Sequence, residues 1–417
     1  MKEEKNRTLL AEEFPEQMNP RFVPDILLII GIFLVSVNLR THLAGVGPLL
    51  PMISRDYNLT SSQIGLMTTV PLVAFGLISP LVARFTDRFG IEKMIFAGIF
   101  TMFITSILRV FTGPAGLYFF TFILGAGLSI CNVALPSLIK KDFPIHMAGT
   151  MTSMYTITFS GFGAIASGVS VPIANSSSLG WKAGILVWSI TAIIASLVWL
   201  PQLKKEHKTH LGKAEDKKEK VSKSVKAWHI SLFMGTSSAL LYIAMGWLSE
   251  IMLSRGFTET QGGWAFAILQ FAVMPATMIV PIIASKMKDH RKIVRLGMIP
   301  LLIGVIGLII PSESIAFVYI ASILYGFGYG TTLGLAMVMF NLKTKTPSQA
   351  AAMSGMAQSI GYIMAAIAPV IFGKIYDFTG NWSQTMIMMI VLVVLTLFFG
   401  SKAGKEGYVI DEVKLEK

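Results

Sequence analysis

The sequence contains few charged residues and almost no cysteine. Of its 417 residues, 14% are charged and one, Cys131, is a cysteine. A single cysteine excludes a disulfide framework and a zinc cluster of cysteines. The sequence also has no H-E-x-x-H run and no phosphate loop of the G-x-x-x-x-G-K type. We therefore expect no cofactor, no metal site and no enzyme chemistry.

Acidic residues are missing from the middle of every apolar segment. None of the 23 Asp and Glu residues lies near such a centre, so a carboxylate relay for protons at mid-membrane is not expected. Soluble segments are equally scarce, because no polar stretch is longer than residues 202–227. This scarcity argues against a sensor, which would normally need an output domain.

Long apolar runs make up most of the chain. Hydrophobic residues account for 53% of it, and the mean hydropathy is +0.65. Twelve runs are long enough to cross a bilayer. They lie at residues 25–52, 60–83, 92–111, 115–138, 147–173, 182–201, 228–253, 261–284, 293–311, 314–340, 348–373 and 382–400. The sequence thus predicts an all-α integral membrane protein with twelve transmembrane helices.

Lys and Arg gather on one side of these segments. If the N-terminus is cytoplasmic, 29 of the 35 Lys and Arg residues face the cytoplasm, and Arg40 lies inside a span. The five that face outward are Arg55, Arg109, Lys182, Arg255 and Lys374. This bias predicts a plasma-membrane protein with both termini cytoplasmic. The net charge of +12 is then explained by topology, and we expect the lipid bilayer and not nucleic acid as the partner.

The chain divides at one basic linker, and its two parts resemble each other. We expect a cytoplasmic tail at 1–24, a six-helix bundle at 25–201, the linker at 202–227, a second six-helix bundle at 228–401 and a cytoplasmic tail at 402–417. Residues 58–65 resemble residues 256–263 at an offset of 198, and Tyr118 with Gly125 and Gly127 matches Tyr319 with Gly326 and Gly328 at an offset of 201. A nearly constant offset indicates a duplicated unit, and therefore two pseudo-symmetric bundles.

Arg40 is the one basic residue placed deep inside an apolar segment. It lies fifteen residues beyond Asp25, which is ~22 Å along a helix in a hydrocarbon core ~30 Å thick. A guanidinium at this depth costs at least a few kcal/mol and marks a candidate functional site. Either carbonyl groups of neighbouring helices hold it as a structural residue, or it faces a cavity and binds a small polar or anionic solute. We favour the second interpretation.

Two further residues are candidates for proton coupling. His42 lies ~200° around the helix from Arg40, so the two cannot face one cavity while the helix stays regular. It shares a face with Asn38, which suggests a hydrogen bond between them. His42 is either a neutral packed histidine or a carrier of a coupled proton. Glu250, a few residues from the outer end of its span, is the second candidate.

The loop at residues 83–93 resembles the signature loop of the major facilitator superfamily, G-x-x-x-D-R-x-G-R-K. Asp87, Arg88, Gly90 and Lys93 keep that pattern, whereas Glu92 replaces its first terminal base. The resemblance implies that this loop is a gating motif. An ordinary charged hairpin is the alternative.

A helix start at residues 346–349 offers the loop a partner. Thr346 is expected as the N-cap, Pro347 at the first helical position, and Gln349 as the closing residue of a capping box. Such an end carries a partial positive charge that attracts a carboxylate such as Asp87. A bond between them would close the cytoplasmic side in one state and break in the other.

Other runs are more specific and resemble the cyanate and 2-nitroimidazole transporter family. They are residues 38–40, 46–51, 65–71, 135–144 and 179–182, with shorter matches at 241–242 and 247–248. Thr41 and Ser249 stand where the family usually has proline. The resemblance implies the major facilitator fold, a central cavity lined by spans 1, 2, 4, 5, 7, 8, 10 and 11, and secondary active transport of a small anionic or polar solute by alternating access.

On this resemblance, polar and aromatic side chains in the lining spans become candidate contacts of the substrate. The amides Asn132, Gln270 and Gln358 need partners at mid-span, as substrate contacts or as contacts between helices. The aromatic candidates are Tyr155, Tyr242, Trp247, Tyr325, Tyr329 and Tyr362. Each of them is either part of a cavity wall or a packing residue. Trp247 is also the best candidate for the interfacial aromatic belt.

The substrate class leaves one rival within transport. A cyanate-like anion or a nitroimidazole-like compound fits the family, and the alternative is efflux of drugs or toxic compounds. Residues 161–168 lack the G-P-x-x-G-G run typical of drug/proton antiporters, and a deep arginine suits an anion better than a lipophilic cation. We expect the protein to function as a monomer.

Overall fold

The computed structural model describes residues 25–143, 145–204, 221–345 and 347–410, and all regular structure in these ranges is helical. Within these ranges, twelve helices are long and apolar enough to cross a membrane. The prediction of an all-α membrane protein with twelve spans is therefore confirmed.

The helices form two sets of six spans. The first set comprises α2 (Ile26–Ala44), η1 (Gly47–Leu49), α3 (Leu50–Tyr57), α4 (Ser61–Phe89), α5 (Ile91–Phe111), α6 (Gly113–Asp142), α7 (Ile145–Ser176), α8 (Trp181–Trp199) and η2 (Leu200–Lys204). The second comprises η3 (Val221–Lys223), α9 (Val225–Leu253), α10 (Glu259–Ala284), α11 (Arg291–Ile309), α12 (Ile315–Leu342), α13 (Pro347–Thr379) and α14 (Trp382–Gly404). The first span is the broken helix formed by α2, η1 and α3.

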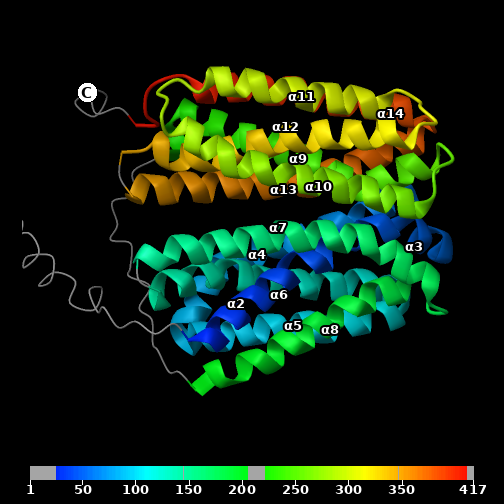
Figure 1. The fold of residues 1–417 in the computed structure, drawn as a ribbon, viewed down its shortest axis with the longest axis horizontal. Coiled ribbons are helices and arrows are strands. Elements are labelled where there is room, and N and C mark those ends of the chain that lie inside the picture. The colour runs from blue at the N-terminus through cyan, green and yellow to red at the C-terminus, as the bar shows by residue number, and fades with distance from the viewer. Residues whose placement is uncertain (1–24, 144, 205–220, 346, 411–417) are drawn as a thin grey trace, which may run out of the picture.

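Figure 1 shows the two sets as separate bundles, with α9–α14 above and α2–α8 below. We call the end where α8 ends and α9 begins the linker end, and the opposite end, where α3 lies, the distal end. Most of the predicted linker at 202–227 lies outside the described residues, so its bounds stay a prediction.

The same capping chemistry starts equivalent helices in both bundles. Thr60 caps α4 through a capping box closed by Gln63, and Thr258 caps α10 through one closed by Gln261. Both pairs satisfy backbone N–H groups that a helix start leaves open. The offset of 198 between them is the one seen in the sequence, so the duplication extends to local structure.

Glycines bring neighbouring helices close together at equivalent positions. Gly125 of α6 lies against the backbone of Pro71 in α4, and Gly326 of α12 lies against the backbone of Leu269 in α10. Neither position leaves room for a Cβ atom. The second repeat match thus marks a shared packing contact.

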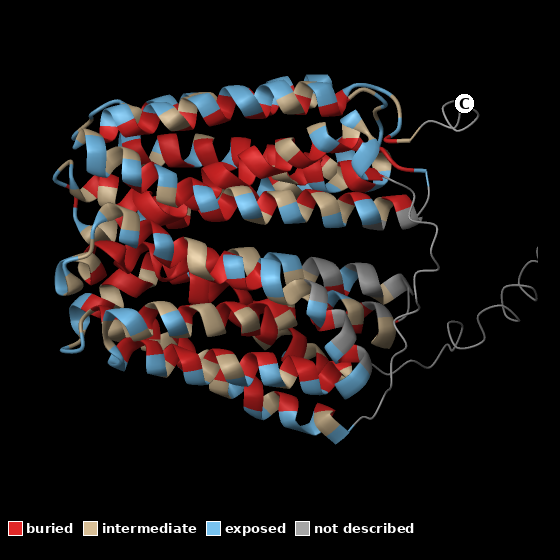
Figure 2. Cartoon of the chain, turned by 180° about the vertical axis from the view of Figure 1, so that it is seen from behind, coloured by how far each residue is buried: buried red, intermediate tan, exposed pale blue. Residues whose placement is uncertain are grey.

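Buried residues line the inside of each bundle, as Figure 2 shows, and many apolar side chains point outward. Ile190, Leu197, Ile299 and Ile303 are examples, each about half exposed in the isolated chain. An exposed apolar surface of this kind is what a bilayer covers. In contrast, α9 is buried along nearly its whole length.

The two bundles touch each other at the distal end. The carboxylate of Asp377 in α13 accepts hydrogen bonds from the backbone nitrogens of Ser61 (3.1 Å) and Ser62 (2.9 Å) at the start of α4. Arg55 of α3 forms an ion pair with Glu259 of α10. These contacts close the distal end.

Candidate functional site

Arg40 lies between the two bundles. Its Nη2 atom donates a hydrogen bond to Oε1 of Gln270 in α10, at 3.3 Å, and its guanidinium carbon stands 5.2 Å from the ring centroid of Phe159 in α7. Both Arg40 and Gln270 are buried, and the amide nitrogen of Gln270 has no partner among the described residues. Arg40 therefore contacts the other half of the protein and not lipid.

A glycine makes room for this arginine. A Cβ atom at Gly163 of α7 would overlap Cγ of Arg40 and lie 3.2 Å from Nε2 of Gln270. Gly163 thus controls where the guanidinium can stand. The sequence shows it only as one of three glycines in residues 161–168, with nothing to separate it from its neighbours.

Phenol and amide groups surround Arg40. Tyr155 of α7 donates a hydrogen bond to Oδ1 of Asn132 in α6 at 3.1 Å, and the side chain of Asn132 also interacts with Tyr362 of α13. The charge of Arg40 interacts electrostatically with Tyr155, Tyr329 and Tyr362. Tyr242 of α9 interacts in turn with Tyr329 and Tyr362.

We call these residues the central cluster. Its members are Arg40, Asn132, Tyr155, Phe159, Tyr242, Gln270, Tyr329 and Tyr362. Both bundles contribute to it, so most of the candidates chosen from the sequence meet at one place. Phe159 and Gly163 are the members of this neighbourhood that sequence reasoning missed.

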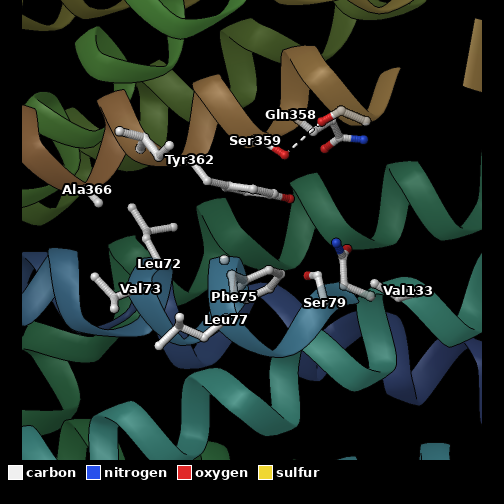
Figure 3. A pocket seen from close by; sticks show the side chains of 14 residues that line it. Leu72, Val73, Phe75, Leu77, Ser79, Val133, Gln358, Ser359, Tyr362 and Ala366 are labelled. Carbon is white, nitrogen blue, oxygen red and sulfur yellow. Dashed lines mark hydrogen bonds between the residues drawn. The ribbon is translucent and has the colours of Figure 1, made fainter. Parts of the chain in front are cut away.

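A cavity of about 660 Å³ adjoins the central cluster between α4, α6 and α13 (Figure 3). Asn132 and Tyr362 belong to both. Gln358 and Ser79 add polar groups to a mostly apolar wall that includes Phe75. The volume falls within the range of small-molecule sites. Gln358 therefore lines this cavity, whereas no described contact joins it to Arg40.

Trp247 lies elsewhere, and its assignment to the interfacial belt is wrong. Its side chain is 1% exposed, and its Nε1 atom donates to the carbonyl oxygen of Pro369 at 3.0 Å. Its ring packs against Phe372 and Trp382. Tyr325 is also a packing residue, with its hydroxyl bonded to the carbonyl oxygen of Leu240 at 2.8 Å. Contact between Trp247 and substrate stays a prediction.

His42 contacts Asn38 through the backbone. Its Nδ1 atom lies 3.0 Å from the carbonyl oxygen of Asn38. The Asn38 side chain instead bonds to Thr191 of α8, donating to its carbonyl oxygen at 3.1 Å and accepting from its hydroxyl at 2.9 Å. The sequence thus predicts the contact between His42 and Asn38 correctly, but it does not predict that Asn38 contributes its backbone carbonyl group. His42 faces Arg109 across a small cavity, away from the central cluster.

Arg109 is buried, which its place near the outer end of a predicted span does not reveal. Its side chain is 1% exposed inside the first bundle, and its assignment to the outer side stays a prediction. Glu250, in contrast, lies at the distal end, where it interacts electrostatically with Arg55. A coupling role for His42 or Glu250 stays a prediction.

The predicted gating motif is described only in part. Gly90 joins α4 to α5 with a φ of +90°, a conformation that favours glycine. Arg88 is exposed over the ring of Phe89, and Lys93 is exposed. The side chain of Asp87 and residue Thr346 lie outside the described residues, so their proposed bond stays a prediction. Pro347 starts α13 as expected, and Gln349 accepts from the backbone nitrogen of Lys345 at 3.0 Å.

Residues 28–369 match the family model described as Major Facilitator Superfamily. The chain belongs to this superfamily. It is 36% identical over 383 residues to the 2-nitroimidazole transporter of Escherichia coli (strain K12), covering 91% of this chain and 96% of that protein. It is 21% identical over 381 residues to the cyanate transport protein CynX of the same strain, covering 89% and 97%. Within the superfamily it is therefore a member of the cyanate and 2-nitroimidazole transporter family.

A solved structure shows the same superfamily fold. The nucleoside transporter NupG superimposes with a TM-score of 0.75 at 13% identity, covering 90% of this chain and 99% of that one. At this identity the likeness concerns the fold alone. Together with the family match, it establishes a multi-pass membrane transporter with two six-helix bundles, and not an enzyme.

Proposed function

We propose that this transporter moves a small solute that carries delocalised negative charge or a nitro group, by alternating access. The position of Arg40 carries this proposal, because its guanidinium is buried between the bundles beside an amide and several phenols. A guanidinium fork binds paired oxygens better than a point charge does. Phe159 adds an aromatic face against which a flat solute can stack.

The relatives support the same class of solute. Their names refer to 2-nitroimidazole and to cyanate, and a nitro group and a small anion both present electron-rich atoms to a donor. A buried cation would repel a lipophilic cation. No observation favours the alternative of drug efflux.

Arg40 and Gln270 connect solute binding to movement of the halves. They belong to different bundles, so a solute that takes over the guanidinium replaces a contact between the halves. A ligand that interacts differently with two arrangements shifts the balance between them. The bundles can then rock about the central cluster.

The described arrangement is closed at its distal end. We place both termini in the cytoplasm of the cell, as the Lys and Arg bias favours, so this is an inward-facing state. The cavity beside the central cluster then serves as the inner access route, with Asp87 and Arg88 gating it. The transporter acts as a monomer in the plasma membrane.

Counterflow in liposomes tests the proposal. Liposomes that contain the purified protein are loaded with unlabelled solute. Labelled cyanate, labelled 2-nitroimidazole or a labelled cationic dye is then added outside. We expect accumulation of at least one of the first two. Arg40→Lys should abolish it, because an ammonium cannot reproduce the planar fork.

Arg295→Lys is the matched control, since Arg295 is exposed on α11. It should transport normally. Unchanged transport by Arg40→Lys would remove Arg40 from the site, and accumulation of the dye alone would overturn the substrate class.

A further inference from the structure

Arg109 of α5 is a buried cation with few partners among the described residues. Its side chain is 1% exposed, and neither Nε nor Nη2 has a hydrogen-bond partner among the described residues. A buried guanidinium is strongly unfavourable unless another group neutralises or hydrogen-bonds it. The central cluster does not use Arg109, so its retention needs a separate explanation.

Two more polar groups that have no hydrogen-bond partner in the described part of the chain lie around the same cavity as Arg109. They are Nε2 of His42 in α2 and the hydroxyl of Thr121 in α6, and both residues are buried. The cavity has a volume of about 10 Å³, which is room for one water molecule or one small ion. Three polar side chains whose hydrogen-bonding atoms lack partners in the described residues surround one small cavity. This arrangement indicates that a small molecule or ion binds there.

The charge of the cavity is positive. Within the described residues, no Asp or Glu lines it, and the lining residues of α4 and α9 are uncharged. Arg109 is the charged group that interacts electrostatically with His42. The Nδ1 atom of His42 faces a carbonyl oxygen, which can only accept, so Nδ1 carries a proton. A neutral His42 therefore turns a lone pair toward the cavity.

We propose that Arg109, Thr121 and His42 form a binding site for one small monovalent anion of chloride size, and that the anion binds together with a proton on Nε2 of His42. Arg109 and Thr121 donate to the anion. Protonation turns Nε2 from an acceptor into a third donor. The site is too small for a nitroimidazole, so it is separate from the solute site proposed at Arg40.

The second bundle covers this site. Met245 of α9 lines the cavity, and its backbone lies against Gly47 of the first span. This contact belongs to the distal half of the interface, so opening the distal end uncovers the site. The anion and its proton would then exchange with the distal side.

Thermal unfolding of the purified transporter tests the site without any transported solute. Sodium chloride is titrated against sodium gluconate at constant ionic strength, and binding of radioactive chloride is counted in parallel. We expect saturable stabilisation by chloride, since a ligand that binds the folded state raises the melting temperature. Gluconate is too large to act. The apparent chloride affinity should fall by about tenfold per pH unit wherever His42 is neutral in the anion-free protein, because each anion brings one proton.

Variants locate the site. Arg109→Met should lose chloride binding, whereas Arg40→Met should keep it. His42→Gln should bind chloride without the pH dependence, because the amide supplies a donor that does not titrate. If Arg109→Met does not fold, Thr121→Val is expected to weaken binding by several fold through the lost hydroxyl.

Absence of a saturable chloride response would overturn the proposal and leave a water molecule as the occupant of the cavity. A response that is unchanged in Arg109→Met, or in both His42→Gln and Thr121→Val, would overturn it as well. None of these readouts depends on transport, so they stay informative if the solute class proposed for Arg40 is wrong.

Discussion

At the scale of single residues, Glu92 shows how a specific neighbour can hold a buried charge. It stands where the superfamily loop has a base. Glu92 is 3% exposed in the first turn of α5. Its Oε1 atom forms an ion pair with Nζ of Lys141 in α6, at 3.0 Å. The helix dipole also stabilises a carboxylate in the first turn of a helix. The departure from the family pattern is thus matched by a partner on the next helix.

Breaking this pair should destabilise the protein. We expect Glu92→Gln to lower the free energy of unfolding by about 2 kcal/mol, because Lys141 then loses a charged partner in a largely buried site. Unfolding in detergent measures the loss, with Glu313→Gln in an exposed loop as the control. The double variant Glu92→Met/Lys141→Met should recover most of it. No loss in the single variant would contradict a stabilising pair.

Gly163 should decide the position of Arg40. Gly163→Ala places a methyl group where Cγ of Arg40 lies, and overpacking of this kind costs about 1–3 kcal/mol. We expect transport to fall by about tenfold or more while membrane insertion stays normal. Gly161→Ala is the control, since a Cβ atom there meets no neighbour. Equal activity of the two variants would show that the solute site tolerates a displaced guanidinium.

At the scale of elements, the last described segment is fastened to the linker end of the second bundle. Lys343, directly after α12, donates from Nζ to the carbonyl oxygens of Lys288 and Lys405, each at 3.0 Å. The backbone nitrogen of Val409 donates to the carbonyl oxygen of Lys343 at 2.7 Å. Lys226 of α9 donates to the carbonyl oxygens of residues 405, 406 and 407, the first of which also accepts from Lys343. Two lysines thus join α9, α12 and the segment after α14.

The stability of this junction should depend on pH. Burial lowers the pKa of Lys343 from 10.5 to about 8, and the nearby charge of Lys226 adds to the effect. Between about pH 8 and 10.5 the unfolded chain keeps a proton that the folded protein releases, so the contribution of Lys343 to the free energy of unfolding rises with pH in this window.

Comparison with Lys343→Met isolates that contribution. The stability of the unmodified protein relative to this variant should increase from about pH 8 to pH 10, as measured by thermal unfolding. Lys286→Met, at an exposed position, should show no such trend. A relative stability that falls over this range would contradict the buried cation.

Features within one helix could be predicted from the sequence, whereas contacts between helices could not. The match between residues 58–65 and 256–263 could be found from the sequence, because a capping box depends only on residues three apart. The angle between Arg40 and His42 likewise follows from helix geometry. The burial of Arg109 and the partner of Glu92 depend on side chains of other helices, and no local pattern encodes those distances. Gly163 could not be singled out for the same reason.

At the scale of the whole molecule, a contact at the start of α4 helps to hold the two bundles together at the distal end; we call this contact the seal. Asp377 holds the first backbone N–H groups of α4, where the helix dipole favours a negative charge. The twelve spans and the duplicated halves could be predicted from hydropathy and repeat spacing. Which end is closed could not, because both arrangements use the same apolar pattern.

Weakening the seal should open the distal end more often. We expect Asp377→Asn to shift the population by about tenfold, the effect of losing one or more charge-assisted hydrogen bonds. A cysteine placed at Thr68, which is 5% exposed, reports the opening by its rate of maleimide labelling in a Cys131→Ala background. Lys374→Gln, exposed on α13, is the control. An unchanged labelling rate would show that other contacts hold the halves together.

The hydrogen bond from Arg40 to Gln270 has a consequence for turnover. In the proposed cycle, an empty carrier must break this bond with nothing to replace it, whereas a solute bound at Arg40 would offer the guanidinium a substitute. We therefore expect the return of the unoccupied protein to be the slow step of that cycle. The exchange of one solute molecule for another across the membrane should consequently be faster than net transport of the solute. Net transport in one direction should be slow.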